Sequence, residues 1–175
     1  MNKTLISIFE TKGPIALTIT NEIFSNEIIF EEFIDSSFFN KVNFSSFQFD
    51  DCELLGVQFN ECYFQNCIFR NSTIRKSEIS DCKFKNCQFI NCILTPQTNF
   101  YRTSFVNCQF SIVDFSSAFL CDCKFTEIKL TQIKFLGTYF VNPKTKNIIS
   151  NDLEFNKSNP MVIKFTNSLP FEKEI

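Results

Sequence analysis

Nine cysteines are the residues of this 175-residue chain most able to do chemistry, as metal ligands, disulfide partners or nucleophiles. A zinc site needs cysteines two to four residues apart that converge on one point. Only Cys121 and Cys123 lie that close, and we expect Cys121 to point outward and Cys123 inward; all other neighbouring cysteines are at least five residues apart. The spacing therefore predicts small, buried, free thiols, with no metal site and no disulfide, as suits a reducing cytoplasm.

Other catalytic patterns are equally sparse. The densest acidic group, Asp50-Asp51-Cys52-Glu53, is expected on a convex, solvated surface. The chain has no histidine, which excludes histidine-based catalysis and imidazole metal ligands. Its three scattered glycines cannot form a glycine-rich phosphate loop. We therefore expect no enzyme and no cofactor.

The organising feature of the sequence is a period of five residues. Large apolar residues recur at every fifth position, with one extra residue inserted within 95–99, and 15 of the 25 phenylalanines occupy these positions. They are Phe39, Phe44, Phe49, Leu54, Phe59, Phe64, Phe69, Ile74, Ile79, Phe84, Phe89 and Leu94, then Phe100, Phe105, Phe110, Phe115, Leu120, Phe125, Leu130, Phe135 and Phe140. Two residues before each lies a mostly small residue, and eight of the nine cysteines are there.

A five-residue period fits neither a helix nor a simple strand. It predicts a chain that turns a corner every five residues, so that four sides close a square coil of about 20 residues and coils stack at about 4.8 Å. The large residues would then form internal columns such as Phe49, Phe69, Phe89 and Phe110, beside small-residue columns such as Cys67, Cys87 and Cys108. The insertion near Pro96 predicts a one-residue bulge.

Residues 62–71 (CYFQNCIFRN) and 82–91 (CKFKNCQFIN) resemble the pentapeptide-repeat family, in which a central Leu or Phe follows a small residue by two. The resemblance covers residues 37–140. It departs from the common pattern in using Phe more than Leu and in the large Phe47, Ile128 and Ile133 at small positions, which suggests looser coils near both ends. It implies an all-β fold, a right-handed quadrilateral parallel β-helix of about five to six coils with capping segments at both ends.

The upstream end has two readings. Residues 1–20 are expected to cap the stack, with short strands at 4–9 and 15–20, and the repeats are expected to span 21–141. If Phe24, Ile29 and Ile34 point inward, Glu22, Glu27 and Glu32 fill small inward positions, where unpaired carboxylates are costly. If Ile23, Ile28 and Phe33 point inward, the glutamates face water and one residue slips near Phe39. We favour the second reading.

The downstream end begins where the period stops, after Phe140. Residues 142–175 include the apolar cluster 161–165, and we expect them to cap the last coil or to pair two subunits. The family resemblance implies a homodimer formed through a terminal segment. No apolar run is long enough for a membrane span, and the first ten residues do not resemble a signal peptide, so we expect a cytoplasmic protein of bacterial type.

The charges bear on function. The family includes DNA mimics that bind DNA gyrase and protect it from quinolones or peptide toxins. Residues 37–140, however, hold nine acidic and ten basic residues, and residues 1–36 hold six and two. One side of the coil is more acidic, with Glu61, Glu78, Asp81 and Asp122 opposed by Lys41 and Arg102, and Phe119 is the aromatic residue most expected to be exposed there.

Two functions follow as hypotheses. The first is a non-enzymatic module that presents flat β-helix sides to a protein partner. The alternative is a DNA-mimicking protein that binds gyrase or a related topoisomerase and confers resistance to quinolones or a toxin. The basic residues are dispersed in the sequence, which gives direct nucleic-acid binding no support.

Overall fold

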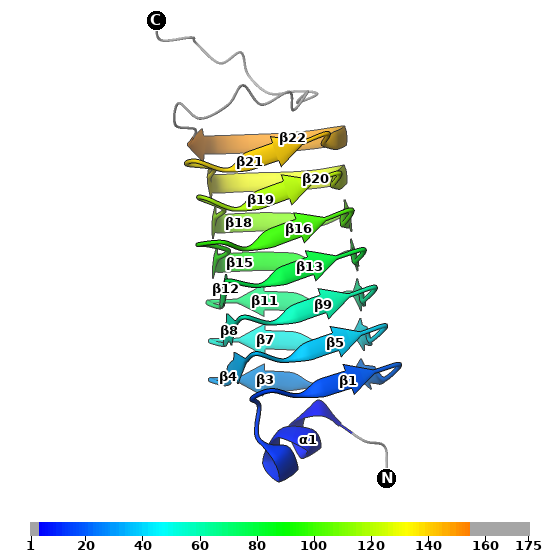
Figure 1. Cartoon of the computed structure of the whole chain (residues 1–175). Helices are drawn as coiled ribbons and strands as arrows, with labels where there is room; N and C mark the ends of the chain where they lie inside the picture. Colours follow the sequence, from blue (N-terminus) through cyan, green and yellow to red (C-terminus); the bar gives the residue numbers. More distant parts are fainter. Residues whose placement is uncertain (1–3, 155–175) are drawn as a thin grey trace, which may run out of the picture.

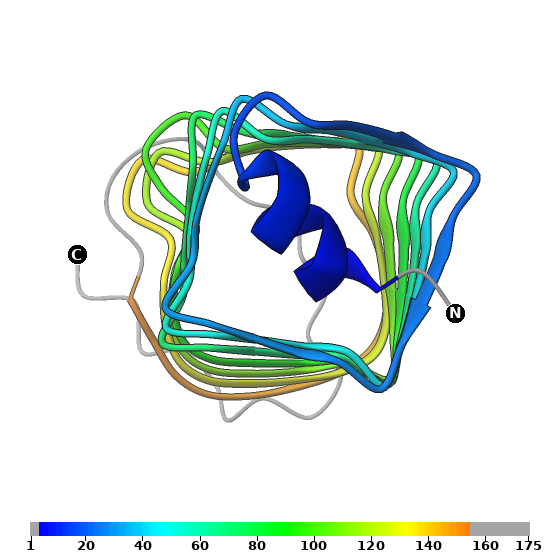
Figure 2. The same ribbon diagram turned by 90° about the horizontal axis from the view of Figure 1, so that it is seen from below.

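The chain winds into a right-handed square solenoid of parallel strands (Figures 1 and 2). The computed structural model describes residues 4–154, with side chains described through residue 150. Seven strands stack on one side of the square, which gives about seven turns where the sequence predicts five to six. The predicted fold class is confirmed.

The four sides, which we call faces 1 to 4, follow one another along the chain. Face 1 contains β1 (Thr18–Thr20), β5 (Phe38–Asn40), β9 (Gln58–Asn60), β13 (Glu78–Ser80), β16 (Asn99–Tyr101), β19 (Phe119–Cys121) and β21 (Tyr139–Val141). Face 2 contains β2 (Ile23–Ser25), β6 (Asn43–Ser45), β10 (Tyr63–Gln65), β14 (Lys83–Lys85), β17 (Ser104–Val106) and the first parts of β20 (Lys124–Lys134) and β22 (Lys144–Glu154).

Face 3 contains β3 (Ile28–Phe30), β7 (Gln48–Asp50), β11 (Ile68–Arg70), β15 (Gln88–Ile93), β18 (Gln109–Asp114) and the middle of β20. Face 4 contains β4 (Phe33–Asp35), β8 (Glu53–Leu55) and β12 (Thr73–Arg75), followed by the last residues of the longer strands. The long strands β15, β18, β20 and β22 therefore continue around corners instead of ending at them.

Strand register follows the five-residue period. Partners are 20 residues apart in the early coils, as in Phe49 and Phe69, and 21 apart across the insertion, as in Phe89 and Phe110. The spacing returns to 20 from Phe100 to Leu120. The extra residue is absorbed between faces 4 and 1, in the stretch 94–98 that contains Pro96, so the predicted one-residue shift is confirmed.

The core is a set of stacked aromatic columns. Phe49, Phe69, Phe89 and Phe110 are buried, and consecutive ring centroids lie 4.8 Å apart with interplanar angles of 8°, 3° and 6°. Rings of neighbouring faces meet edge-on, as Phe59 and Phe64 do at 5.3 Å. Stacked and edge-to-face pairs at these distances are favourable arrangements for aromatic rings. The columns thus join four narrow sheets around one interior.

Each corner needs one residue in the left-handed backbone region. Such residues recur every five positions, for example Asn66, Asp81, Asn86 and Asn91, with φ of 51° to 55°. Asn and Asp tolerate this region better than other residues with a Cβ, which explains their frequency between the large residues. Ile112 is an unusual occupant, because a β-branched side chain at φ 57° is strained.

The N-terminal segment differs from the prediction. Residues Leu5–Lys12 form helix α1, not a strand, and α1 lies across the open end of the first coil (Figure 2). Leu5, Ile8 and Phe9 are buried against the coil. The strand expected within 15–20 is present as β1.

The phase we favour for residues 21–36 is wrong. Phe24, Ile29 and Ile34 are buried, whereas Ile23 and Ile28 are 68% and 54% exposed. No slip occurs near Phe39, because β1 to β4 pair with β5 to β8 at a constant 20-residue spacing. The inward phase is tolerated because Glu27 is not unpaired: its Oε2 accepts hydrogen bonds from the backbone N–H groups of Leu5 at 2.8 Å and Ile6 at 3.2 Å.

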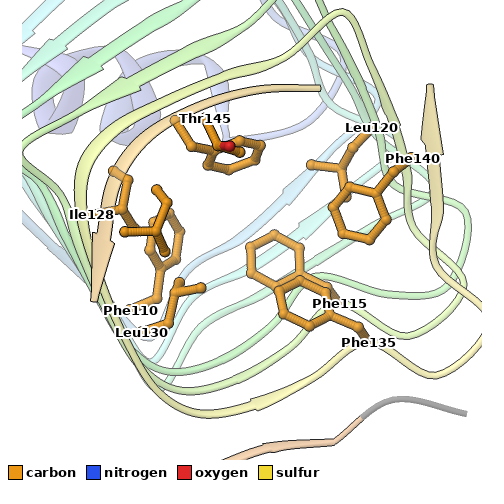
Figure 3. A pocket seen from close by; sticks show the side chains of 10 residues that line it. Phe110, Phe115, Leu120, Ile128, Leu130, Phe135, Phe140 and Thr145 are labelled. Atoms are coloured by element: carbon orange, nitrogen blue, oxygen red, sulfur yellow. The ribbon is translucent and has the colours of Figure 1, made fainter. Parts of the chain in front are cut away.

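The solenoid continues beyond the period. Strand β22 pairs in parallel with β20 through Glu154, past the boundary at 141 that the sequence suggests. In the face 2 column, Thr145 follows Phe84, Phe105 and Phe125. Next to this smaller side chain lies a small apolar cavity of about 20 Å³, bordered also by Phe115, Phe135 and Phe140 (Figure 3). The apolar cluster 161–165 lies outside the described residues.

Candidate interaction surface

The candidate acidic residues lie on face 1 and on the corner that follows it. The outward positions of face 1 form two rows, because the middle residue of each strand points inward. Glu78 and Phe119 belong to the first row. Glu61, Asp81 and Asp122 lie instead on the corner between faces 1 and 2, in the same left-handed positions as Lys41 and Arg102. All five of these corner residues are exposed.

This corner is a ladder of opposite charges instead of a negative strip. Lys41 Nζ lies 3.7 Å from Glu61 Oε2. Arg102 donates two hydrogen bonds to Asp81, Nε to Oδ1 at 2.7 Å and Nη2 to Oδ2 at 2.6 Å. The bidentate contact lowers the pKa of Asp81, the hydrogen bonds from Arg102 being the main cause. The hydrogen bonds and charge of Asp81 raise the pKa of Arg102, and the negative charge of Asp122 in the next coil contributes further.

Glu78 is separate from that ladder. It lies on the face, where its Oε1 accepts a hydrogen bond from Ser80 at 2.8 Å. Among the outward positions of β1, β5, β9, β13, β16, β19 and β21, Glu78 is the single charged residue. The structure thus brings Glu61, Asp81 and Asp122 into one column and leaves Glu78 apart from it.

Three of the four outward aromatic residues of face 1 lie at its C-terminal end, and the fourth, Phe38, lies in β5. The rings of Tyr101 and Phe119 lie 5.6 Å apart. Phe119 and Tyr139 are directly paired across β19 and β21, and Tyr139 is 54% exposed. Val141, 37% exposed, lies on the same strand as Tyr139. We call Tyr101, Phe119, Tyr139 and Val141 the aromatic patch.

The other candidate groups are held by neighbouring coils. Arg70 Nη1 donates to Asp50 Oδ2 at 3.1 Å, and Arg75 pairs with Glu53. Within residues 4–154, no group of three or more Cys, Asp or Glu side chains is placed to hold a metal ion. No helix in that range is long and apolar enough to cross a membrane.

The thiols serve as small internal donors. All nine cysteines are free, and all but Cys121 are buried. In the column of Cys67, Cys87 and Cys108, each Sγ lies 3.3 to 3.5 Å from the carbonyl oxygen of a column phenylalanine in the preceding coil. Burial raises the pKa of Cys52 and Cys92 to about 11, and that of Cys123 to about 12. These thiols are therefore protonated at neutral pH and poor nucleophiles.

Comparison with known proteins places this architecture in a family. A family model described as pentapeptide repeats matches residues 58–95 with eight copies. Residues 58–95 are pentapeptide repeats. Solved structures of this class share the fold. A trypsin-treated variant of QnrB1, a plasmid-mediated fluoroquinolone resistance protein, matches with 14% identity and a TM-score of 0.60, covering 83% of this chain and 75% of QnrB1.

Two cyanobacterial pentapeptide-repeat proteins also match. HetL of Nostoc sp. strain PCC 7120, involved in heterocyst differentiation regulation, has 11% identity and a TM-score of 0.24, with coverages of 88% and 94%. Rfr23 of Cyanothece 51142 has 11% identity and a TM-score of 0.28, with coverages of 86% and 97%. A search of curated proteins finds no match. At 14% identity, the match to QnrB1 supports the fold alone.

Sequence reasoning missed one charged surface. It treats the basic residues as dispersed, but the fold gathers five exposed lysines on face 2: Lys83, Lys85, Lys124, Lys144 and Lys146. Strand pairing aligns Lys124 with Lys144 directly, and Lys83 Nζ lies 5.8 Å from the Tyr63 ring centroid. Grouping the sequence by every fourth repeat would have revealed that these lysines share face 2.

Proposed function

We propose that this pentapeptide-repeat protein is a non-enzymatic interaction module that binds a protein partner through face 1. The aromatic patch carries the proposal. Tyr101, Phe119 and Tyr139 form neighbouring outward rings, of which Tyr139 is exposed and Tyr101 and Phe119 are half-buried. Clustered aromatic residues commonly supply most of the binding energy at protein interfaces.

The surroundings of the patch suit an interface. Face 1 carries a single charged outward residue, Glu78, and the paired charges of Asp81 and Arg102 lie at its corner. Protein interfaces commonly combine such an apolar centre with a polar, solvated rim. The sheet is held by columns of buried rings, so the patch would bind with little ordering cost.

The test is affinity capture from the native host with the wild-type protein, one double variant and one single variant. Phe119→Ser with Tyr139→Ser should lose the captured partner. Phe38→Ser, in the same outward row but at the N-terminal half of face 1, should retain it. Thermal melts of both variants should match wild type, because the replaced side chains point outward. Retention of the partner by the double variant would refute binding through the patch.

A second candidate is protection of DNA gyrase by DNA mimicry, which the shared fold with QnrB1 favours. Duplex DNA carries one negative charge per about 1.7 Å of axis. The face 1 corner instead pairs Glu61 with Lys41 and Asp81 with Arg102. The experiment is gyrase supercoiling with and without this protein and ciprofloxacin. Protection or inhibition at micromolar protein would support the mimic, and no effect would exclude it.

A further inference from the structure

The first coil exposes more large apolar side chains than the coils above it. Ile15, Ile23, Ile28, Phe30 and Phe33 are all more than 40% exposed. Corresponding positions in the next coil are mainly polar: Phe30 pairs with Asp50, and Phe33 pairs with Glu53. Contiguous exposed apolar groups in a folded protein commonly mark an interaction site.

A groove lies next to these side chains, between α1 and the first coil. It is lined by Ile6, Phe9, Glu10, Pro14, Ile29 and Glu32. Phe9 and Ile29 are buried and form an apolar floor, whereas Ile6 and Glu10 are exposed on the helix. The corner Glu31-Glu32 separates β3 from β4, so Phe30 and Phe33 flank it on two faces. We call Ile6, Glu10, Phe30, Glu31, Glu32 and Phe33 the N-terminal rim.

The acidic groups of this rim differ from those one coil further along. Asp50 and Glu53, on the same two faces, are each paired with an arginine of the following coil. In the part of the chain that the structure describes, Glu10, Glu31 and Glu32 form no ion pair. Glu27, by contrast, is occupied by the backbone of α1. The rim therefore combines an apolar groove with three carboxylates that lack a cationic partner there.

We propose that the N-terminal rim binds a segment of another protein in which apolar side chains alternate with lysine or arginine. The apolar side chains would enter the groove over Phe9 and Ile29 and pack on Phe30 and Phe33. The cationic side chains would pair with Glu10, Glu31 and Glu32. Charge complementarity favours a cationic segment over an acidic one, since like charges across an interface are unfavourable. This surface is distinct from face 1 and its occupancy does not depend on the aromatic patch.

The test uses fluorescein-labelled ten-residue peptides and fluorescence anisotropy with the full chain. A peptide that alternates leucine and lysine should bind, and peptides that alternate leucine with glutamate or serine with lysine should bind at least about tenfold more weakly. Phe30→Ser with Phe33→Ser should weaken the leucine–lysine peptide at least about tenfold. Glu31→Gln with Glu32→Gln should weaken it and reduce its dependence on salt.

The matched control is Ile149→Ser, which removes a side chain of similar exposure (59%) from β22 at the opposite end of the solenoid. This variant should bind the peptide as wild type does. Equal binding by the Phe30/Phe33 double variant, or equal weakening by Ile149→Ser, would overturn the proposal. If the Phe30/Phe33 double variant does not fold, the Glu31/Glu32 double variant decides: unchanged peptide affinity and unchanged salt dependence would overturn the proposal.

Sedimentation velocity tests whether a second copy of this chain, instead of another protein, covers the N-terminal rim. A wild-type dimer that the Phe30/Phe33 double variant converts to monomer would show that a second copy covers the rim, and would overturn the assignment to another protein. A wild type and variant with the same sedimentation coefficient, together with the expected peptide result, would support it. Retention of the face 1 partner by the rim variants would show that the two surfaces act separately.

Discussion

Glu27 and Leu5, 22 residues apart in sequence, are joined by a hydrogen bond of 2.8 Å from the Leu5 backbone N–H to the Glu27 carboxylate. Ile6 donates to the same oxygen, while the Thr4 hydroxyl accepts from the Ser7 N–H at 3.0 Å. The first N–H groups of a helix have no partner within it, and a nearby negative charge is favourable there. One buried carboxylate thus attaches α1 to the first coil.

We expect Glu27→Ala to destabilise the protein by about 1 kcal/mol or more, because it leaves two helix N–H groups without this partner. Urea unfolding followed by circular dichroism measures the change. Glu10→Ala, on the exposed side of α1, is the control and should have little effect. Equal stability of Glu27→Ala and wild type would show that α1 is held by its apolar contacts alone.

The same site predicts a pH dependence. Burial raises the pKa of Glu27 above its usual value of 4.5, against the opposing hydrogen bonds from Ile6 and Leu5. A raised folded-state pKa means that folding favours the protonated form, so this contribution is full below the unfolded pKa and is lost as pH rises through the folded value. The stability of wild type relative to Glu27→Gln should therefore fall as the pH rises from the usual glutamate pKa of 4.5 through the higher pKa of the folded state. A constant difference would contradict it.

Phe69→Ala should destabilise the protein by about 3–5 kcal/mol, since it opens a cavity in the middle of a stacked column. Its ring lies 4.8 Å from both Phe49 and Phe89. Ile68→Ala, at the neighbouring outward position, should cost less than about 1 kcal/mol. Denaturant midpoints measure both, and similar losses would argue against the column as the main source of stability.

Thiol labelling should distinguish Cys121 from the other eight cysteines. Cys121 is the only one that is not buried, so a thiol reagent should modify it first in the native protein and all nine after unfolding. Burial, and then the charge of Asp122, raise the pKa of Cys121. Asp122→Asn should therefore lower this pKa and speed labelling near neutral pH. Mass spectrometry of the labelled protein identifies the site; fast native labelling of Cys67 or Cys87 would contradict the packing.

Ile112→Asn should stabilise the protein by about 1 kcal/mol, because asparagine tolerates the left-handed backbone better than a β-branched residue. The new side chain would follow Asn71 and Asn91, whose amides already form a hydrogen bond of 3.0 Å at this corner. Gly56 occupies a corner with the same left-handed backbone, at φ 62°, so Gly56→Ala should destabilise the protein by a similar amount. Thermal melts measure both, and a lower melting temperature for Ile112→Asn would refute the strain.

The five-residue period predicts which side chains lie in the interior, because residue spacing alone decides which positions point inward. Phe49, Phe69 and Phe89 can be assigned to one column from spacing, since each must return to the same side after four corners. The register across Pro96 follows from a single extra residue. The sequence does not reveal how outward rings from different coils combine, and Tyr101, Phe119 and Tyr139 become neighbours only when the coils are stacked.

The two errors at the N-terminal end share one cause. Assigning residues 4–9 to a strand removes the helix N–H groups that Glu27 requires, and without them an inward glutamate is unfavourable. The phase with Ile23 and Ile28 inside then looks better. The correct phase depends on a contact between two segments 22 residues apart, which a repeat pattern within residues 21–36 does not contain.

The regular stacking of coils of 20 residues, with one shift to 21, also has a mechanical consequence. Each coil is hydrogen-bonded only to the coils before and after it, so tension applied along the chain would load one coil interface at a time. Each coil that detaches would release about 70 Å of extended chain. Stretched from its ends, the protein would lengthen in regular steps, with an irregular step where the coil around Pro96 contains 21 residues.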